Sequence, residues 1–331
     1  MTKLQPISGT KPLVEGALAA ALAAILALVG LYIPILSSLA TIVWTIPITL
    51  MVARYSLRDG LLAVIVTMVL VIILSNPLTA VLYVAQFGVV GLFYGLALKR
   101  QFSAGSSILG GVGISIISTV IITLASLQIM GITFSDLGQQ LQSSVDSIVE
   151  FYRRAGVLED YQAQGITEEA LREAATQIVL FFQRILPGLL AVGAAITASL
   201  NYLIVQLVAR RLQIPVVSLP PFREWQMPWY LTWGVVVAFA ALLAGDYFGL
   251  SWLMIGGQNL LVLYAPFLII FGIAVVSYYY QKSKLPRWFK ASLIIFSCFY
   301  ISITVVLIMS VGLFDPLFNY RKLGSKEGMR D

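Results

Sequence analysis

The chain has 331 residues, of which 59% are hydrophobic and only 11% are charged, with a net charge of +6. Soluble domains carry about 25% charged residues, so this composition excludes a soluble protein and indicates a polytopic membrane protein. The chain has no histidine and a single cysteine, Cys298, which excludes histidine-based acid–base chemistry, Cys–His nucleophiles, histidine-ligated zinc and disulfide scaffolds.

The apolar runs predict membrane-spanning helices, each of which needs about 20 residues. Because the runs lack the two-residue alternation of membrane β-strands, the predicted fold class is all-α, a polytopic transmembrane helical bundle with about nine spans, or eight as the alternative. Gly256-Gly257 is expected to break the chain, leaving 249–256 as an interfacial or re-entrant piece. The nine spans are expected at residues 13–30, 34–54, 60–75, 78–98, 106–129, 185–208, 228–245, 259–281 and 291–312.

A polar insert at residues 130–184 interrupts this pattern and holds eight acidic residues against four arginines. Apolar residues at helical spacing predict an amphipathic helix at about 135–154. Thr167 is expected to cap a second helix that runs into the span 185–208, with a kink at Pro187. The insert is interpreted as a solvated helical cap on the outer membrane surface or, alternatively, as a lid over an outward-facing site. The apolar residues are Leu137, Leu141, Val145, Ile148 and Tyr152.

Lysine and arginine residues next to the spans predict the orientation, because they concentrate on the cytoplasmic side. With the N-terminus cytoplasmic, 13 of the 21 basic residues, Arg223 among them, lie on the cytoplasmic side of what is expected to be a bacterial plasma membrane. An odd span count then places the basic tail, with Arg321, Lys322, Lys326 and Arg330, outside. We expect a six-helix membrane domain at 1–211, including the insert, and a three-helix region with this tail at 212–331.

Several polar or aromatic side chains within or near the spans are candidates for binding a small molecule, because such groups are costly in lipid. The alternative is that they hydrogen-bond between helices as structural glue. No catalytic residue, metal site or cofactor is expected, since the spans lack a buried carboxylate pair and the chain lacks a nucleotide-binding loop. Nucleic acid is not an expected partner. The candidates are Trp44, Tyr83, Gln86, Asn201, Gln258 and Asn259.

The first span carries small residues on two adjacent rows of one helix face. Such residues let another helix approach closely. The face therefore serves either packing within this chain or docking of another membrane subunit. Its members are Gly16, Ala19, Ala20, Ala23, Ala24 and Ala27.

Four features taken together carry a resemblance to a known family. They are the alanine-rich first helix, the segment 186–212, the segment LPPFREWQMPW at 219–229 and the ending GLFDPLFNYRK. With them the chain resembles the YybS family of bacterial integral membrane proteins, a domain-of-unknown-function family, over about 12–322. Within the C-terminal motif, Gly312, Asp315, Asn319 and Arg321 stand out, and an exposed, weak Asp315–Arg321 ion pair is expected at the membrane surface.

The first six helices are also similar to the substrate-binding S components of energy-coupling-factor transporters. In those proteins an AxxxA pattern of helix 1, here Ala19, Ala23 and Ala27 or Ala20 and Ala24, docks onto a transmembrane coupling subunit. The resemblance implies a small-molecule capture subunit that depends on separate coupling and ATPase subunits. The alternative function is a non-catalytic scaffold in cell-envelope, division or sporulation processes, since the cell-shape protein MreD has a similarly built bundle. An enzyme is not expected.

Overall fold

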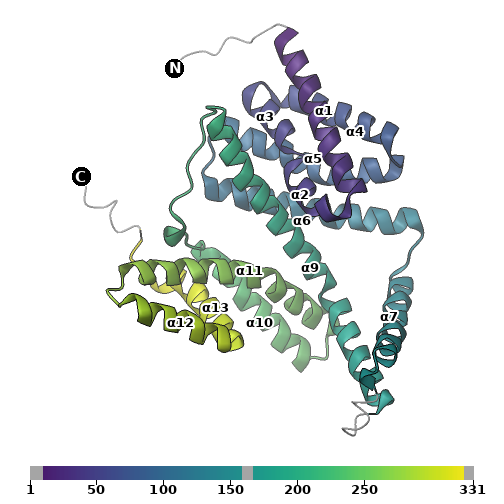
Figure 1. Cartoon of the computed structure of the whole chain (residues 1–331), viewed down its shortest axis with the longest axis vertical. Helices are drawn as coiled ribbons and strands as arrows, with labels where there is room; N and C mark the ends of the chain where they lie inside the picture. Colours follow the sequence, from purple (N-terminus) through teal and green to yellow (C-terminus); the bar gives the residue numbers. More distant parts are fainter. Residues whose placement is uncertain (1–9, 159–166, 324–331) are drawn as a thin grey trace. The chain divides into compact units, whose positions relative to one another are not determined.

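The computed structural model describes residues 10–158 and 167–323, and every secondary-structure element in these ranges is a helix (Figure 1). Nine helical segments of this part are long and apolar enough to cross a membrane, which confirms the predicted fold class. The chain forms two compact units. The first comprises Met1–Thr133 and Gly193–Leu219, and the second comprises Phe134–Val192 and Pro220–Asp331. Division of the chain at residue 211 stays a prediction.

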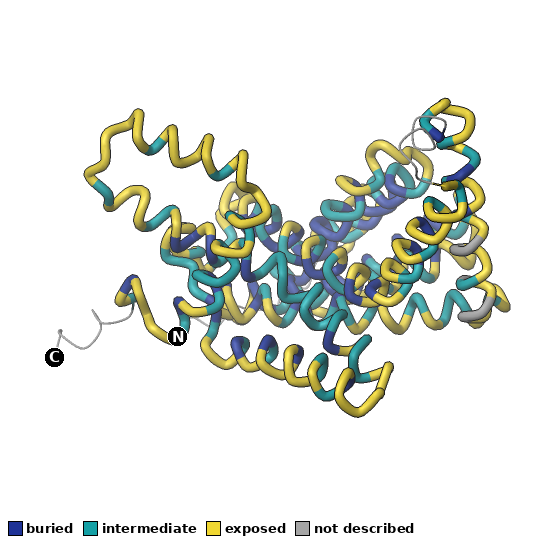
Figure 2. Tube along the Cα trace, turned by 90° about the horizontal axis from the view of Figure 1, so that it is seen from below, coloured by how far each residue is buried: buried dark blue, intermediate teal, exposed yellow. Residues whose placement is uncertain are grey.

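The first unit packs around the small-residue face of its first helix. Trp44 and Ile48 are fully buried against Ala23, Ala24 and Ala27, so a large indole fills the space that three alanines leave open. Figure 2 shows the alternation of buried and exposed turns along the helices. The helices of this unit are α1 (Thr10–Tyr32), α2 (Pro34–Val43), α3 (Ile46–Arg54), α4 (Leu57–Leu74), α5 (Pro77–Lys99), α6 (Ala104–Met130) and the second half of α9 (Glu168–Arg211).

The predicted span 34–54 is interrupted in its middle, where α2 ends and α3 begins. Pro47 explains the break, because it has no N–H to donate to the carbonyl of Val43 and its ring crowds the preceding turn. The two halves are packed differently. Only Ala40 is buried in α2, whereas six of the nine residues of α3 are buried.

The crossing of α3 and α5 depends on glycine. A Cβ added to Gly95 would lie 2.4 Å from Cβ of Val52 and 2.6 Å from the carbonyl oxygen of Thr49. The two helices therefore approach more closely than any side chain at this position would allow.

The second unit contains a helical pair formed by α7 and the first half of α9. Val145 and Val149 of α7 are buried against Ala175 and Val179, so this part of the apolar stripe packs on protein. The predicted continuation through Pro187 is confirmed, since α9 runs unbroken to Arg211. The side chains of Leu137 and Leu141 lie outside the described residues. This unit holds α7 (Phe134–Arg154), α10 (Thr232–Tyr247), α11 (Ser251–Lys282), α12 (Arg287–Phe299), α13 (Ile301–Phe318) and two short 3₁₀ turns, η1 (Phe222–Glu224) and η2 (Trp229–Leu231).

The expected break at Gly256-Gly257 is wrong, because α11 is continuous from Ser251 to Lys282. Gly257 faces α10, and a Cβ there would lie 2.7 Å from the carbonyl oxygen of Ala238. Gly257 therefore serves a close crossing of α10 and α11, and Gly256 makes no such contact. No interfacial or re-entrant piece exists at 249–256.

The predicted ninth span at 291–312 is also wrong in its boundaries. The chain leaves helical geometry at Tyr300, which separates the 13-residue α12 from the 18-residue α13. At about 1.5 Å per residue, α12 reaches only about 20 Å and is too short to span the bilayer core. The candidate span of this region is α13, at 301–318.

Both ends of the α12–α13 pair are tied to the end of α11. Lys290 Nζ at the start of α12 donates to the carbonyl oxygens of Tyr280 (2.7 Å) and Ser283 (3.0 Å). Beyond the end of α13, the carbonyl oxygen of Tyr320 accepts from the Tyr279 hydroxyl at 2.9 Å. The two helices form a hairpin with its tip at Tyr300.

The expectation that Arg223 and Arg321 lie on opposite membrane faces is therefore wrong. Arg321 Nη1 donates to the carbonyl oxygen of Arg223 at 2.5 Å, and Arg223 Nη1 donates to Gln281 Oε1 at 2.6 Å. All three residues lie at the end of α11. Lys326 and Arg330 of the predicted basic tail lie outside the described residues.

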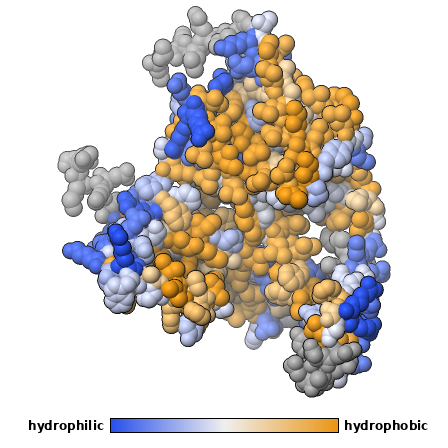
Figure 3. Space-filling model, viewed as in Figure 1, coloured by the Kyte–Doolittle hydropathy of each residue, from blue (hydrophilic) through white to orange (hydrophobic). Residues whose placement is uncertain are grey.

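Hydrophobic side chains cover much of the helix surface, as the orange areas of Figure 3 show. Leu18, Ile25 and Ile35 of the first unit are 66%, 59% and 90% exposed. Apolar surface on this scale is unfavourable in water and requires lipid around the helices. The chain is an integral membrane protein in contact with the bilayer.

An interrupted span as the candidate functional site

The break between α2 and α3 is held by an asparagine from another helix. Asn201 of α9 donates from Nδ2 to the carbonyl oxygen of Ile42 and to Thr45 Oγ1, the latter at 2.8 Å. A turn that lacks the N–H of Pro47 needs such partners at membrane depth, since lipid supplies none. The carbonyl oxygen of Asn201's own amide, Oδ1, is buried without a partner.

An aromatic stack lies on the other side of the break. The Trp44 and Tyr83 rings are stacked with centroids 5.5 Å apart, and Phe87 meets Tyr83 edge-on at 5.2 Å. The Tyr83 hydroxyl is 3.1 Å from Thr41 Oγ1. The indole Nε1 of Trp44 is buried without an acceptor. The break therefore presents an unpaired donor and an unpaired acceptor on residues that adjoin it.

Three of the six predicted binding residues thus meet at this break, and the other three do not. Gln86, three residues after Tyr83 on α5, is instead engaged with α6, where its Nε2 donates to Thr119 Oγ1 at 3.1 Å. Gln258 and Asn259 belong to the second unit. The carbonyl oxygen Oε1 of Gln258 is buried without a partner.

Asn259 hydrogen-bonds backbone groups of α9 next to a proline, as Asn201 does between α2 and α3. Its Oδ1 accepts from the N–H of Gly188 at 2.5 Å, and its Nδ2 donates to the carbonyl oxygen of Arg184 at 2.7 Å. These two backbone groups are four residues apart and would bond to each other in a regular helix. The amide is inserted beside Pro187, so Asn259 has its donors and acceptor engaged in structure.

The predicted docking face of α1 is mostly inside the first unit. Ala20, Ala23, Ala24 and Ala27 are at most 3% exposed, so these four positions pack within the chain. Gly16 and Ala19 remain partly exposed. The alternative interpretation of the small-residue face, packing within this chain, describes the four buried positions.

The C-terminal motif forms a buried cluster in the second unit. Arg321 Nη2 lies 2.7 Å from Asp315 Oδ2, and both side chains are at most 2% exposed, so the expectation of an exposed, weak pair is wrong. Asn319 adopts a left-handed conformation (φ 44°) that turns the chain back and brings Arg321 inward. Gly312 lies against α11, where an added Cβ would be 2.3 Å from the carbonyl oxygen of Leu268.

The same cluster joins the ending to the segment 219–229. Arg321 also donates to the carbonyl oxygen of Trp225 at 2.8 Å, and Gln226 Nε2 donates to Asp315 Oδ2 at 3.1 Å. The guanidinium and the carboxylate thereby have several partners each. Two segments that were distinctive in the sequence are held together by one buried network.

Sequence reasoning missed Thr41 and Thr49 at the interrupted span. Thr49 Oγ1 donates to the carbonyl oxygens of Thr45 (3.1 Å) and Gly91 (3.0 Å), and Thr41 contacts Tyr83. The signal was available, because Thr41, Thr45 and Thr49 recur every four residues on one helix face of the predicted span. Within 10–158 and 167–323, no cluster of three histidine, cysteine or acidic residues could hold a metal ion.

Comparison with known proteins agrees with the membrane architecture. Residues 21–316 match a family described as "Predicted membrane protein (DUF2232)". The chain is 25% identical over 287 residues to "Uncharacterized protein YybS" of Bacillus subtilis (strain 168), with 84% of this chain and 87% of that protein covered. No solved structure matches the chain. The chain belongs to the DUF2232 family of membrane proteins.

Proposed function

We propose that this chain is a non-enzymatic membrane protein that captures a small, neutral or weakly polar molecule at the interruption between α2 and α3. The observation that carries the proposal is the pair of unpartnered buried atoms, Trp44 Nε1 and Asn201 Oδ1. A buried polar group without a partner costs about 1–3 kcal/mol. A ligand that supplies an acceptor and a donor would recover this free energy on binding.

The packing of the interrupted span supports a route to this site. Ile35 and Leu39 of α2 are 90% and 62% exposed, whereas α3 is held firmly in the core. In a topology with the N-terminus inside, α2 is the outer half of the span. Movement of α2 about residues 44–45 would uncover the Trp44–Tyr83 stack from the outer side, and discontinuous helices form the binding sites of many transporters.

A capture subunit of an uptake system is the form of this function that we favour. The spans contain amides, threonines and aromatic rings at the break, which suit reversible binding better than bond cleavage. Docking of a coupling subunit on α1 would use Gly16 and Ala19, because the other four small residues are occupied within the chain. Co-purification of a coupling subunit and an ATPase in mild detergent tests this part.

The test of capture is mass spectrometry of small molecules that co-purify with the full chain. Trp44→Phe removes the indole N–H and keeps an aromatic ring, and Trp233→Phe is the matched control because Trp233 is 60% exposed. We expect a bound molecule in the wild type and in Trp233→Phe, with about fivefold less in Trp44→Phe, since one buried hydrogen bond is worth about 1 kcal/mol.

Equal amounts of the molecule in wild type and Trp44→Phe would place binding elsewhere. If no small molecule co-purifies and pooled metabolites cause no thermal shift, the capture function is refuted. A discrete septal or sidewall localisation together with that result would favour the non-catalytic scaffold instead.

A further inference from the structure

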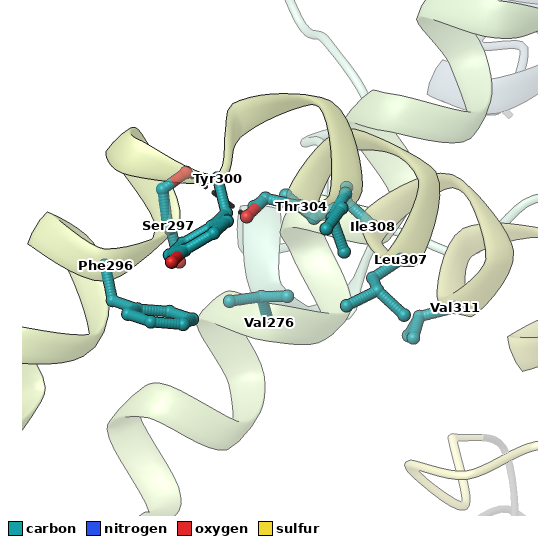
Figure 4. Close-up of a pocket in the computed structure, with 9 residues that line it drawn as sticks. Val276, Phe296, Ser297, Tyr300, Thr304, Leu307, Ile308 and Val311 are labelled. Carbon is teal, nitrogen blue, oxygen red and sulfur yellow. Dashed lines mark hydrogen bonds between the residues drawn. The ribbon is translucent and has the colours of Figure 1, made fainter.

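An apolar groove runs between α11 and the α12–α13 hairpin in the second unit (Figure 4). Its volume is about 520 Å³. Two of its lining residues, Ser297 and Thr304, carry small hydroxyl side chains, and Thr304 Oγ1 donates to the backbone carbonyl oxygen of Ser297 at 3.2 Å. The other lining residues include Val276, Phe296, Tyr300, Leu307 and Val311.

The groove leads from the tip of the hairpin toward its open end. On α12, Phe296 is one to two turns beyond Phe289 and Lys290. On α11, Val276 is one turn before Tyr280, whose ring lies under Lys290 Nζ at 4.6 Å from its centroid. The groove is therefore lined by the tip of the hairpin and by α13, and the junction where α11 ends and α12 begins lies beyond Val276 and Phe296.

This junction is strongly basic. The sequence 247–314 contains Lys282, Lys284, Arg287 and Lys290 and no acidic residue. Lys284 and Arg287 are exposed and have no acidic partner among the described residues. Glu224, at the same end of the unit, lies 3.7 Å from Arg223. Trp288, 72% exposed, adds the kind of aromatic side chain that is enriched at the headgroup level of a bilayer.

We propose that this protein binds one anionic phospholipid, with the phosphate at Lys284 and Arg287 and the end of an acyl chain in the groove at Phe296 and Ser297. Charge complementarity selects the headgroup, because two exposed cations precede the part of α12 that lines the uncharged groove. The length also fits. From Arg287 to Ser297 is ten residues, or about 15 Å of helix, which matches one leaflet of a hydrocarbon core about 30 Å thick.

The proposal is tested with a fluorescent label on Cys298, the single cysteine, which is exposed on α12 beside Ser297. The full chain is reconstituted in phosphatidylcholine vesicles that contain a minor fraction of either brominated phosphatidylglycerol or brominated phosphatidylcholine. Bromine in the acyl chain quenches the label on contact. We expect stronger quenching by the anionic lipid at equal mole fraction.

Three variants separate the headgroup from the chain. Lys284→Gln/Arg287→Gln removes the two cations and should lower the preference for phosphatidylglycerol by about fivefold for each charge. Ser297→Trp fills the groove and should lower quenching by phosphatidylglycerol to the level of phosphatidylcholine. Arg210→Gln/Arg211→Gln removes two exposed cations of the first unit and should change nothing. Quenching by brominated phosphatidylcholine verifies that each variant is inserted.

Several results would overturn the proposal. They are equal quenching of the wild type by both lipids, a preference that survives Lys284→Gln/Arg287→Gln, and an equal loss in the Arg210→Gln/Arg211→Gln control, which would indicate general surface charge. Unchanged quenching of Ser297→Trp would place the chain outside the groove. Displacement of the lipid by inorganic phosphate at constant ionic strength would show a site for free anions.

Discussion

The buried Asp315–Arg321 network makes a sharp prediction for stability. Replacing Arg321 by methionine keeps most of the apolar stem but removes the guanidinium. The Asp315 carboxylate would then be buried with Gln226 Nε2, at 3.1 Å, as its remaining side-chain donor among the described residues. The carbonyl oxygens of Arg223 and Trp225 would each lose the donor now 2.5 and 2.8 Å away.

The expected cost follows from this geometry. Breaking a buried ion pair by removing one partner costs about 3–5 kcal/mol, because the other charge remains uncompensated. Replacing both partners by apolar residues removes that charge, and such exchanges are often close to neutral for the pair itself. Asp315→Leu/Arg321→Met should therefore destabilise the protein less than Arg321→Met alone, with the carbonyl oxygens of Arg223 and Trp225 accounting for the remaining loss of about 1–3 kcal/mol.

Unfolding of the purified protein in mixed micelles with increasing sodium dodecyl sulfate measures the free-energy differences. Arg321→Met, Asp315→Leu and the double variant form a double-mutant cycle, and we expect a coupling of more than about 2 kcal/mol. A loss below about 1 kcal/mol in Arg321→Met, or a double variant whose loss equals the sum of both single variants, would refute the account of a buried, uncompensated charge.

Two further predictions concern α11 and α7. Gly257→Ala should destabilise the second unit, because its Cβ would lie 2.7 Å from a carbonyl oxygen of α10, whereas Gly256→Ala, with nothing within 4 Å, should stabilise it by about 0.5–1 kcal/mol. Thermal shifts of the two variants check this, and shifts of the same sign would contradict the crossing described. The hydrogen bond from Arg154 is the main cause of the lowered pKa of Glu150; desolvation opposes it, and the charges of Arg154 and Arg153 lower the pKa further. Because this pKa is lower when folded, the stabilisation is present above the unfolded-state pKa of about 4.3 and is lost as pH falls through the folded value. As pH falls below about 4, amide exchange in α7 should therefore accelerate in the wild type, relative to intrinsic rates, but not in Glu150→Gln. Equal pH dependence of the two proteins would contradict this reasoning.

The sequence predicted the helical class and most span positions, because length and hydrophobicity alone decide which segments can cross a bilayer. It could not decide what a glycine or proline does inside an apolar run. Gly256-Gly257 was expected to break a helix that is continuous, since only the partner helix α10 shows that Gly257 is a contact point. No proline or glycine lies at the break at Tyr300, and the sequence shows no local cause for it.

The candidate site was predictable in part. Trp44, Tyr83 and Asn201 stood out as polar or aromatic groups in apolar runs, and they meet at one break. The sequence could not show which side-chain amides only stabilise the helices, because this depends on whether each amide atom has a hydrogen-bond partner in the folded protein. Asn259 has every polar atom engaged with backbone, whereas Asn201 retains an unpaired oxygen. That difference exists only after two distant helices are placed side by side.

The hairpin of α12 and α13 changes how membrane crossings are counted. Since its start and its finish are both hydrogen-bonded to the end of α11, the chain makes no net crossing between Lys282 and Arg321. We therefore expect the loop at 283–286 and Arg321 to lie on the same side of the membrane. A reporter enzyme fused after Arg321 would be active on the same side of the membrane as one inserted into the loop at 283–286, and the basic C-terminal residues would obey the same charge rule as the loops before them.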